Sequence, residues 1–374
     1  MIATPRVRWS TGEVDAFYLE SPASLGKLSD QLQRAGDDGA AGKRHVEKYA
    51  DLTLPEEGVL LDTMASHEHA YDVVRGAMEA IAVRGRGVAK AVTQTADAYA
   101  REDAAGREAM DRVFRGLDPS SPRPDFSRYD AARRGPAFSD TAEPSDHFKQ
   151  PERPSDDGPL FQYDPSSDVF SPAAGLRGVC IQVTGADPFE AMVRWLSGDW
   201  VAYHRCVTVW RQVGAACEQI GANIGRAGAD TESVWRGNAS DEARQYLAEL
   251  ARSVSDFAPI CAKLAEHYEA GVQAAQKFNE ALAAIAASLA EAASAWLIAT
   301  MGLRITSRYQ RAALIAIITY YTSQILQLVS EAMALWGKAK DRAAGVVGLV
   351  KGVEFGRLRD VRPPRMLLSP GSPL

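Results

Sequence analysis

Apolar residues follow a helical period in the N-terminal part of the chain. Leu25, Leu28 and Leu32 share one face of a predicted helix that begins near Ser21 or Ser24, both suitable N-caps. The segment DLTLPEEG, in which proline interrupts the pattern, predicts a turn before a second helix. The apolar positions of that second helix are Tyr71, Val74, Met78, Ile81, Val88, Val92 and Tyr99. Glycines weaken both helices, but two helices and a short turn still predict an αα-hairpin within residues 1–115.

A longer helical pattern occupies residues 176–300. One predicted helix carries a single apolar stripe made of Trp200, Tyr203, Val207, Trp210, Cys217 and Ile224. After a glycine-rich break, a three–four spacing continues over about seven heptads, which is typical of a coiled-coil seam. Its members are Leu247, Leu250, Val254, Phe257, Cys261, Leu264, Tyr268, Gly271, Ala275, Phe278, Leu282, Ile285, Leu289, Ala292 and Trp296. Pro259 is expected to bend this helix, and the pattern predicts a second, longer αα-hairpin.

The stretch between the two hairpins, residues 116–175, differs in composition. It is rich in Pro, Ser and Asp and has no lasting apolar period. Such a segment cannot bury enough apolar surface to offset the entropy of ordering, so we expect a disordered linker. No strand-like run reaches a convincing length, and the predicted fold class is all-α. Two long αα-hairpins, packed as a four-helix bundle or kept separate, are followed by C-terminal apolar helices.

Residues 301–374 combine an apolar helix with a basic tail that we expect to be flexible. Residues 312–330 contain no charged side chain over 19 positions. That length could span a bilayer, but two Tyr, two Gln, two Thr and two Ser favour a helix buried in a bundle. Membrane contact through residues 292–330 stays open as an alternative.

Charge and composition narrow the classes of function. The 374 residues include 42 Lys and Arg against 48 Asp and Glu, for a formal net charge of −6. Broad nucleic-acid binding needs a basic face, so we do not expect a nucleic-acid partner. The stretch MIATPRVRWSTGEVDAF contains no apolar h-region, and no cleavable signal peptide is expected.

Candidate catalytic and metal-binding groups are weak, and we expect a non-enzymatic protein without a cofactor or metal. The HExxH, GxSxG and GxxxxGK[ST] motifs do not occur in the sequence. His67 and His69 flank Glu68, but residues two apart on a helix point to different faces, which makes a poor metal pair. The same argument applies to His204 and Cys206.

The four cysteines are too few for a disulfide-stapled scaffold, and none forms a CxxC pair. If the downstream hairpin turns at Trp235, Cys206 and Cys261 lie at similar separations before and after the turn and could face each other. Two interpretations remain open. The pair forms a disulfide in an oxidising space, or, as we favour, both residues are small buried hydrophobic groups in the helix seam.

Two short motifs lie near the ends of the two predicted hairpins. Trp235-Arg236-Gly237 reads W-x-G in the turn of the downstream hairpin, and Tyr99 to Asp103 reads Y-x-x-x-D near the end of the upstream hairpin. This layout resembles the WXG (ESAT-like) helical-hairpin proteins that type VII secretion systems of actinobacteria and other Gram-positive bacteria export. TADAYAREDAAGREAM is similar to the C-terminal end of ESX-secretion-associated excreted factors. DPFEAMVRWLSGDWVAYHRCVTVW resembles the segment that precedes the WXG hairpin in larger substrates.

The resemblance covers about Ser21–Arg115 and Ala186–Leu289, and it implies a composite export signal. In the family, two hairpins pair antiparallel, so that the Trp turn of one lies beside the Tyr–Asp end of the other, where the secretion ATPase is thought to read both. Here each hairpin carries one motif: LPEEG stands in the upstream turn, and no Y-x-x-x-D follows the downstream W-x-G. We therefore expect the two hairpins to pair within one chain. Separate recruitment of small WXG proteins by each hairpin is the competing interpretation.

The resemblance also implies roles for the motif residues. Trp235 would fill a groove, Gly237 would allow the bend, and Tyr99 and Asp103 would present the signal on one helical face, with Asp103 offering its charge to a basic pocket of the ATPase. The predicted function is thus a type VII substrate or accessory protein. It would be cytoplasmic before export and secreted or cell-surface afterwards by a leaderless pathway, in some cases delivering a separately encoded effector. A membrane-active or pore-forming protein and a cytosolic helical scaffold or chaperone remain as alternatives.

Overall fold

The computed structural model describes residues 17–52, 59–112, 123–130, 137–152, 200–274 and 276–277, together with single helical positions between 316 and 341. Most of these residues are helical, which confirms the predicted helical fold class. Among them, no helix is long and apolar enough to cross a membrane. Several predicted features lie wholly or largely outside the described residues: the seam beyond position 277, the apolar stretch 292–330, and the C-terminal tail.

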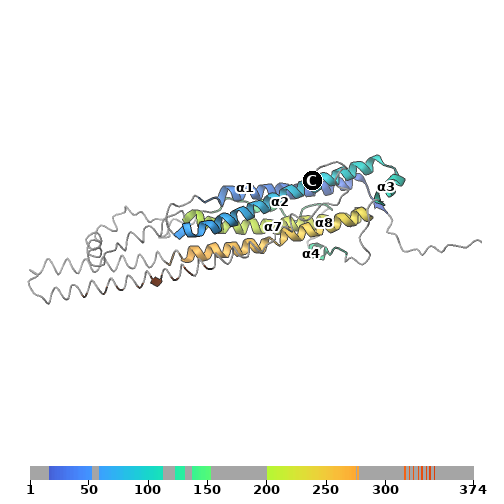
Figure 1. Cartoon of the computed structure of the whole chain (residues 1–374). Coiled ribbons are helices and arrows are strands. Elements are labelled where there is room, and N and C mark those ends of the chain that lie inside the picture. The colour runs from blue at the N-terminus through green and yellow to red at the C-terminus, as the bar shows by residue number, and fades with distance from the viewer. Residues whose placement is uncertain are drawn as a thin grey trace, which may run out of the picture.

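Four helices dominate the described part and run lengthwise beside one another (Figure 1). They are α1 (Pro22–Tyr49), α2 (Val59–Arg101), α7 (Trp200–Val234) and α8 (Asn238–Ser255), and helical structure resumes at 258–274. Three short helical elements are α3 (Ala104–Asp111), α4 (Ser127–Asp130) and η1 (Pro144–His147). A two-stranded antiparallel sheet, β1 (Tyr18–Leu19) with β2 (Trp235–Arg236), corrects the expectation that no strand forms.

Helix α1 begins as the sequence predicts and lies antiparallel to α2. Ser21 is its N-cap, and the Ser21 hydroxyl accepts a hydrogen bond from the backbone N–H of Ser24. Gly36 and Gly85 bring the two backbones into direct contact, since a Cβ on Gly85 would lie 2.7 Å from the backbone nitrogen of Gly36. These glycines therefore serve close helix packing, besides weakening each isolated helix.

Helix α7 packs against α8 on one side and against α1 on another. Gly221 meets α8 near Ala251 and Ser255, so these two helices also run antiparallel. Helix α8 ends at Ser255, and positions 256–257 form a turn before the helix that begins at 258. The interruption occurs because Pro259 has no N–H to bond the carbonyl oxygen of Ser255. Buried side chains of α1, α2, α7, α8 and the 258–274 helix form one core, in which Trp210 and Trp235 are the largest fully buried side chains.

The predicted disordered linker needs correction over 123–130 and 137–152, which lie against the helices. Phe126, Tyr129 and Phe138 are buried, and two of them sit over glycines of α7: Tyr129 over Gly225 and Phe126 over Gly228. Aromatic side chains spaced along a polar segment supply enough apolar burial to order it. The average composition of residues 116–175 does not reveal these few aromatic side chains.

Polar contacts from α7 and α1 fix the same segment. The backbone N–H of Phe138 donates to Asp230 at 2.9 Å, and that of Thr141 donates to the Asn223 side chain at 2.8 Å. The Gln31 side-chain amide donates to the Ser139 carbonyl oxygen at 3.1 Å. Asn223, Asp230 and Gln31 are themselves buried, so these hydrogen bonds give their side chains partners away from water.

Of the two interpretations of Cys206 and Cys261, the disulfide is the one that the structure contradicts. No disulfide joins the three described cysteines, which are buried thiols. The Cβ of Cys261 lies 3.0 Å from the position that a Cβ on Gly214 would occupy, and Gly214 follows Cys206 by eight residues, or about 12 Å along the helix axis. Cys206 and Cys261 therefore lie at different levels of α7, too far apart to bond. They fit the favoured interpretation of small buried hydrophobic groups.

Candidate functional site

The W-x-G motif forms the turn that the sequence predicts between α7 and α8. Trp235 and Arg236 make up β2, and Gly237 precedes the first residue of α8 with φ 122° and ψ 177°. This backbone conformation is accessible almost only to glycine. A Cβ at Gly237 would also lie 2.9 Å from both carboxylate oxygens of Asp111. The turn thus requires glycine for its conformation and for the approach of a neighbouring carboxylate.

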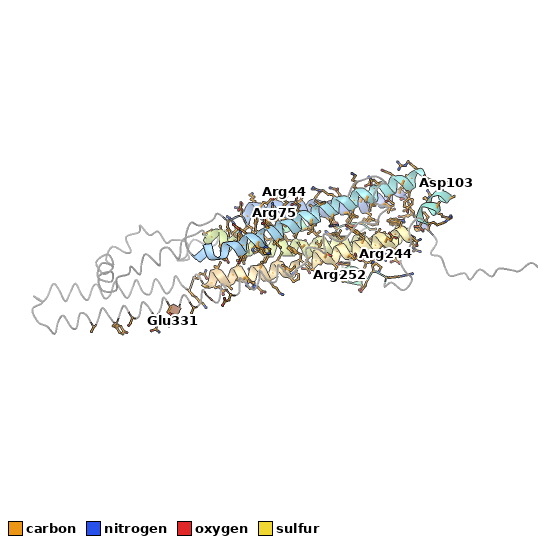
Figure 2. All side chains as sticks on the ribbon, viewed as in Figure 1. Arg44, Arg75, Asp103, Arg244, Arg252 and Glu331 are labelled. Carbon is orange, nitrogen blue, oxygen red and sulfur yellow. The ribbon has the colours of Figure 1, made fainter. Side chains whose placement is uncertain are left out.

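The Y-x-x-x-D motif spans the end of α2 and the start of α3. Tyr99 lies in the last turn of α2 and is fully buried, so its side chain is not presented on the helix surface as the sequence analysis expects. Asp103 is exposed, and its Oδ1 accepts a hydrogen bond of 2.7 Å from the backbone N–H of Gly106. Asp103 is therefore the N-cap of α3. Figure 2 shows Asp103 at the end of α2, beside the short helix labelled α3 in Figure 1.

The two motifs meet through their aromatic rings. The ring centroids of Tyr99 and Trp235 are 6.2 Å apart at an interplanar angle of 73°, an edge-to-face contact of favourable geometry. Trp235 is 1% exposed and Tyr99 is 0% exposed, so each ring removes the other from water. Burial, and then the nearby carboxylate of Asp111, raise the pKa of Tyr99 far above its ordinary value.

Strand β1 covers this aromatic contact. Phe17 and Leu19 point inward: the Phe17 ring lies 5.4 Å from the Tyr99 ring, and Leu19 pairs with Trp235 across the sheet. Tyr18 alternates to the exposed side, where the Arg236 guanidinium lies 5.9 Å from the centre of its ring. A hydrogen bond of 2.8 Å from the backbone N–H of Glu20 to the carbonyl oxygen of Val234 extends the pairing by one residue. The sequence offers only one inward pair, too short a pattern to predict a strand.

Asp111, at the end of α3, contacts the start of α8. Its carboxylate accepts hydrogen bonds from the backbone N–H groups of Ala239 at 3.1 Å and Asn238 at 3.4 Å. These amides have no partner within their own helix, and a negative charge is stabilised at a helix N-terminus. Arg107 joins the start of α3 to the end of α2, since its guanidinium donates to the carbonyl oxygen of Tyr99 at 3.5 Å and to that of Glu102, just after α2, at 3.0 Å. Nothing in the sequence pattern singles out Asp111.

We call the assembly of residues 17–20, 99–111 and 234–239 the junction. It contains all four motif residues that the sequence analysis names, Tyr99, Asp103, Trp235 and Gly237, from two segments far apart in the sequence. It also contains β1 and Asp111, which sequence reasoning missed.

His67 and His204, two of the metal-binding candidates in the sequence, lie in environments that favour the neutral imidazole. Nδ1 of His67 and the hydroxyl of Tyr268 share a hydrogen bond of 2.6 Å inside the core, and burial lowers the pKa of His67 to about 4. Burial also lowers the pKa of His204. Within the described ranges, no group of three or more His, Cys, Asp or Glu side chains is arranged to hold a metal ion.

No protein-family model, curated protein or solved structure matches this chain. Functional interpretation therefore depends on the geometry of the junction. At the junction, the helix pair α1–α2 packs against the helix pair α7–α8 through buried aromatic rings, and Asp111 accepts the first N–H groups of α8. The exposed rim of the junction includes Tyr18, Asp103 and Arg236. Such an arrangement can display a shaped surface to a partner protein.

Proposed function

We propose that the chain is a non-enzymatic substrate or accessory protein of a type VII (ESX-like) secretion system, and that the secretion ATPase recognises the junction. The signal is composite, with Trp235 and Gly237 from one helix pair and Tyr99 and Asp103 from the other. The chain would be cytoplasmic before export and secreted or surface-bound afterwards. A separately encoded effector is a further candidate partner.

The observation that carries the proposal is the contact between Tyr99 and Trp235. The resemblance expects these two elements to meet at one end of a pair of hairpins, and their rings lie 6.2 Å apart at that end. Each motif alone occurs by chance in many proteins, so their direct contact at the place that the resemblance expects supports a single composite signal. The contact is the kind of evidence that the sequence alone lacks.

An internal pair of hairpins, forming one four-helix bundle, explains how a single chain carries both elements. The proposal is supported by the packing of α1 against both α2 and α7, and by the buried hydrogen bond between His67 of α2 and Tyr268. A covalent pair needs no small WXG partner to cover its apolar stripes, whereas two separate hairpins would expose them. Separate recruitment of small WXG proteins is therefore the less favoured arrangement.

The exposed rim of the junction is the surface that a partner would touch. Tyr99 and Trp235 are buried, so they act by holding the two helix pairs in register. Tyr18 and Arg236 are exposed on the outer side of the small sheet, next to the motif residues. Tyr and Arg are the residue types that protein interfaces favour.

Export is the test. The full chain is expressed in an actinobacterial host with an active or an inactivated type VII ATPase, and culture filtrate and cells are probed separately. Trp235→Phe loosens the ring contact of the junction, and Trp210→Phe is the matched control, since Trp210 is equally buried on α7 but packs against Tyr268. We expect export only with the active ATPase, reduced export of Trp235→Phe, and normal export of Trp210→Phe.

Two results would overturn the proposal. Export that is independent of the ATPase would remove the type VII assignment. A chain that stays inside the cell under all conditions, although folded, would favour a cytosolic scaffold instead.

A further inference from the structure

Asp103 caps a helix that is too short to be stable alone. Helix α3 has 8 residues, of which Ala104, Ala105, Glu108 and Ala109 are exposed. An isolated helix of this length is marginal in water, so its end contacts decide whether it forms. Asp103 supplies the first of these contacts, because its Oδ1 accepts the backbone N–H of Gly106 at 2.7 Å and its carbonyl oxygen accepts the N–H of Arg107 at 2.9 Å.

The opposite end of α3 holds the W-x-G turn. Asp111 accepts the first N–H groups of α8 and fills the space that the absent side chain of Gly237 leaves. Glu242, one turn into α8, faces the same carboxylate, and burial followed by repulsion from Asp111 raises its pKa. Asp111 therefore occupies an acceptor position that only a correctly placed α3 can supply.

Helix α3 thus connects the two motifs as a strut of about 12 Å. Arg107 joins its start to the carbonyl oxygen of Tyr99 in the last turn of α2 and to that of Glu102 just after α2. Asp111 joins its end to the start of α8. Every hydrogen bond described for the Asp103 side chain is directed into this strut.

We infer that Asp103 is a positioning residue: it starts α3, and α3 holds Asp111 on the W-x-G turn. Asp103 then acts on the junction through its oxygen acceptor, whereas the sequence-based expectation has it offering its charge to the ATPase. The inference about geometry stands alone, and its consequence for export rests on the proposed function.

Amide hydrogen exchange on the purified full-length chain tests the geometric part. Asn caps helices about as well as Asp but carries no charge, whereas Ala removes the cap. We expect Asp103→Ala to speed exchange at the amides of Asn238 and Ala239 by roughly fivefold, and Asp103→Asn to leave it close to wild type. Glu108→Ala is the matched control on the exposed face of α3 and should change nothing at α8.

Asp111→Asn provides a second, independent perturbation. It keeps the size of the side chain and one acceptor oxygen, so the protein should still fold, but it loses the charge that favours the start of α8. Faster exchange at Asn238 and Ala239 in this variant is expected. Unchanged exchange at these amides in Asp103→Ala would overturn the positioning role of Asp103, and unchanged exchange in Asp111→Asn would overturn the role of Asp111 at the start of α8.

The same variants in the export assay separate positioning from charge recognition. Positioning predicts that Asp103→Ala loses export and that Asp103→Asn restores it, while direct charge recognition predicts that both lose it. If exchange at α8 responds as expected but export does not depend on the ATPase, the strut remains and the proposed function fails. If export depends on the ATPase but Asp103→Asn is as defective as Asp103→Ala, the proposed function remains and the positioning role fails.

Discussion

Gly237 is a position in the junction at which a side chain is poorly tolerated. Its φ of 122° and ψ of 177° lie in a region of backbone conformation that residues with a side chain rarely enter. The carboxylate oxygens of Asp111 lie 2.9 Å from the position of an added Cβ. Gly237→Ala therefore forces two changes together, a new backbone conformation in the turn and the withdrawal of Asp111 from the start of α8.

The expected loss of stability combines these two effects. A residue with a side chain in such a conformation costs about 1–3 kcal/mol. Loss of a helix N-cap costs about 1 kcal/mol. We therefore expect Gly237→Ala to lower the free energy of unfolding by about 2–4 kcal/mol, with the lower end applying if the turn relaxes.

Urea denaturation followed by circular dichroism measures this loss, and Gly87→Ala is the matched control. Gly87 is exposed in the middle of α2, and a Cβ there would meet nothing within 4 Å. In a helix interior the same substitution should stabilise the protein by roughly 0.5–1 kcal/mol. A Gly237→Ala variant that loses less than about 1 kcal/mol, or that shifts in the same direction as Gly87→Ala, would refute this account of the turn.

Three further predictions concern helix packing and pH. Gly85→Ala would place a methyl carbon 2.7 Å from the backbone nitrogen of Gly36, and we expect it to lower the free energy of unfolding by about 1–3 kcal/mol in urea denaturation. Burial lowers the pKa of His67 from 6.5 to about 4, so the stability that neutral His67 provides is present above pH 6.5 and lost as pH falls through 4. His67→Gln should therefore flatten this part of the profile of melting temperature against pH. Burial, and then repulsion from Glu143, raise the pKa of Asp38 from 3.8 to about 7. The stability that neutral Asp38 provides to the fold is therefore present below pH 3.8 and lost as pH rises through 7. Asp38→Asn should raise the melting temperature more at pH 8 than at pH 4.

Each of these predictions has a contrary outcome. A Gly85→Ala variant as stable as wild type would contradict the backbone contact between α1 and α2. An acid-side profile unchanged by His67→Gln would mean that another group controls that range. A change of melting temperature in Asp38→Asn that is equal at pH 4 and pH 8 would mean that this site does not hold a neutral carboxyl group.

Local sequence signals predicted the elements that depend on local physics. Ser21 with its N-cap geometry, the helical periods of α1 and α2, and the turn at Gly237 are all short-range features. The two motifs could also be found from the sequence. What spacing could not say is that Tyr99 is buried against Trp235, because burial depends on which helix faces it.

The features that the sequence did not predict depend on contacts between distant segments. Strand β1 forms because β2 offers it a partner, and a two-residue strand has no pattern of its own. The segment 137–152 is ordered by side chains of α1 and α7 far from it in sequence, so its polar composition predicts disorder. The position along α7 that Cys261 faces depends on the register between α7 and the 258–274 helix. Counting residues from the turn at Trp235 did not give this register correctly.

The central claim is that the secretion ATPase reads the junction, and a hydrogen-exchange footprint tests it directly. The purified full-length chain is compared with and without the soluble ATPase domains of the host's type VII system. The account predicts protection on binding at residues 99–112 and 232–241, with the middle of α1 and α2 unchanged. Protection confined to other parts of the chain, or no protection at concentrations at which an established substrate of the same ATPase is protected, would contradict it.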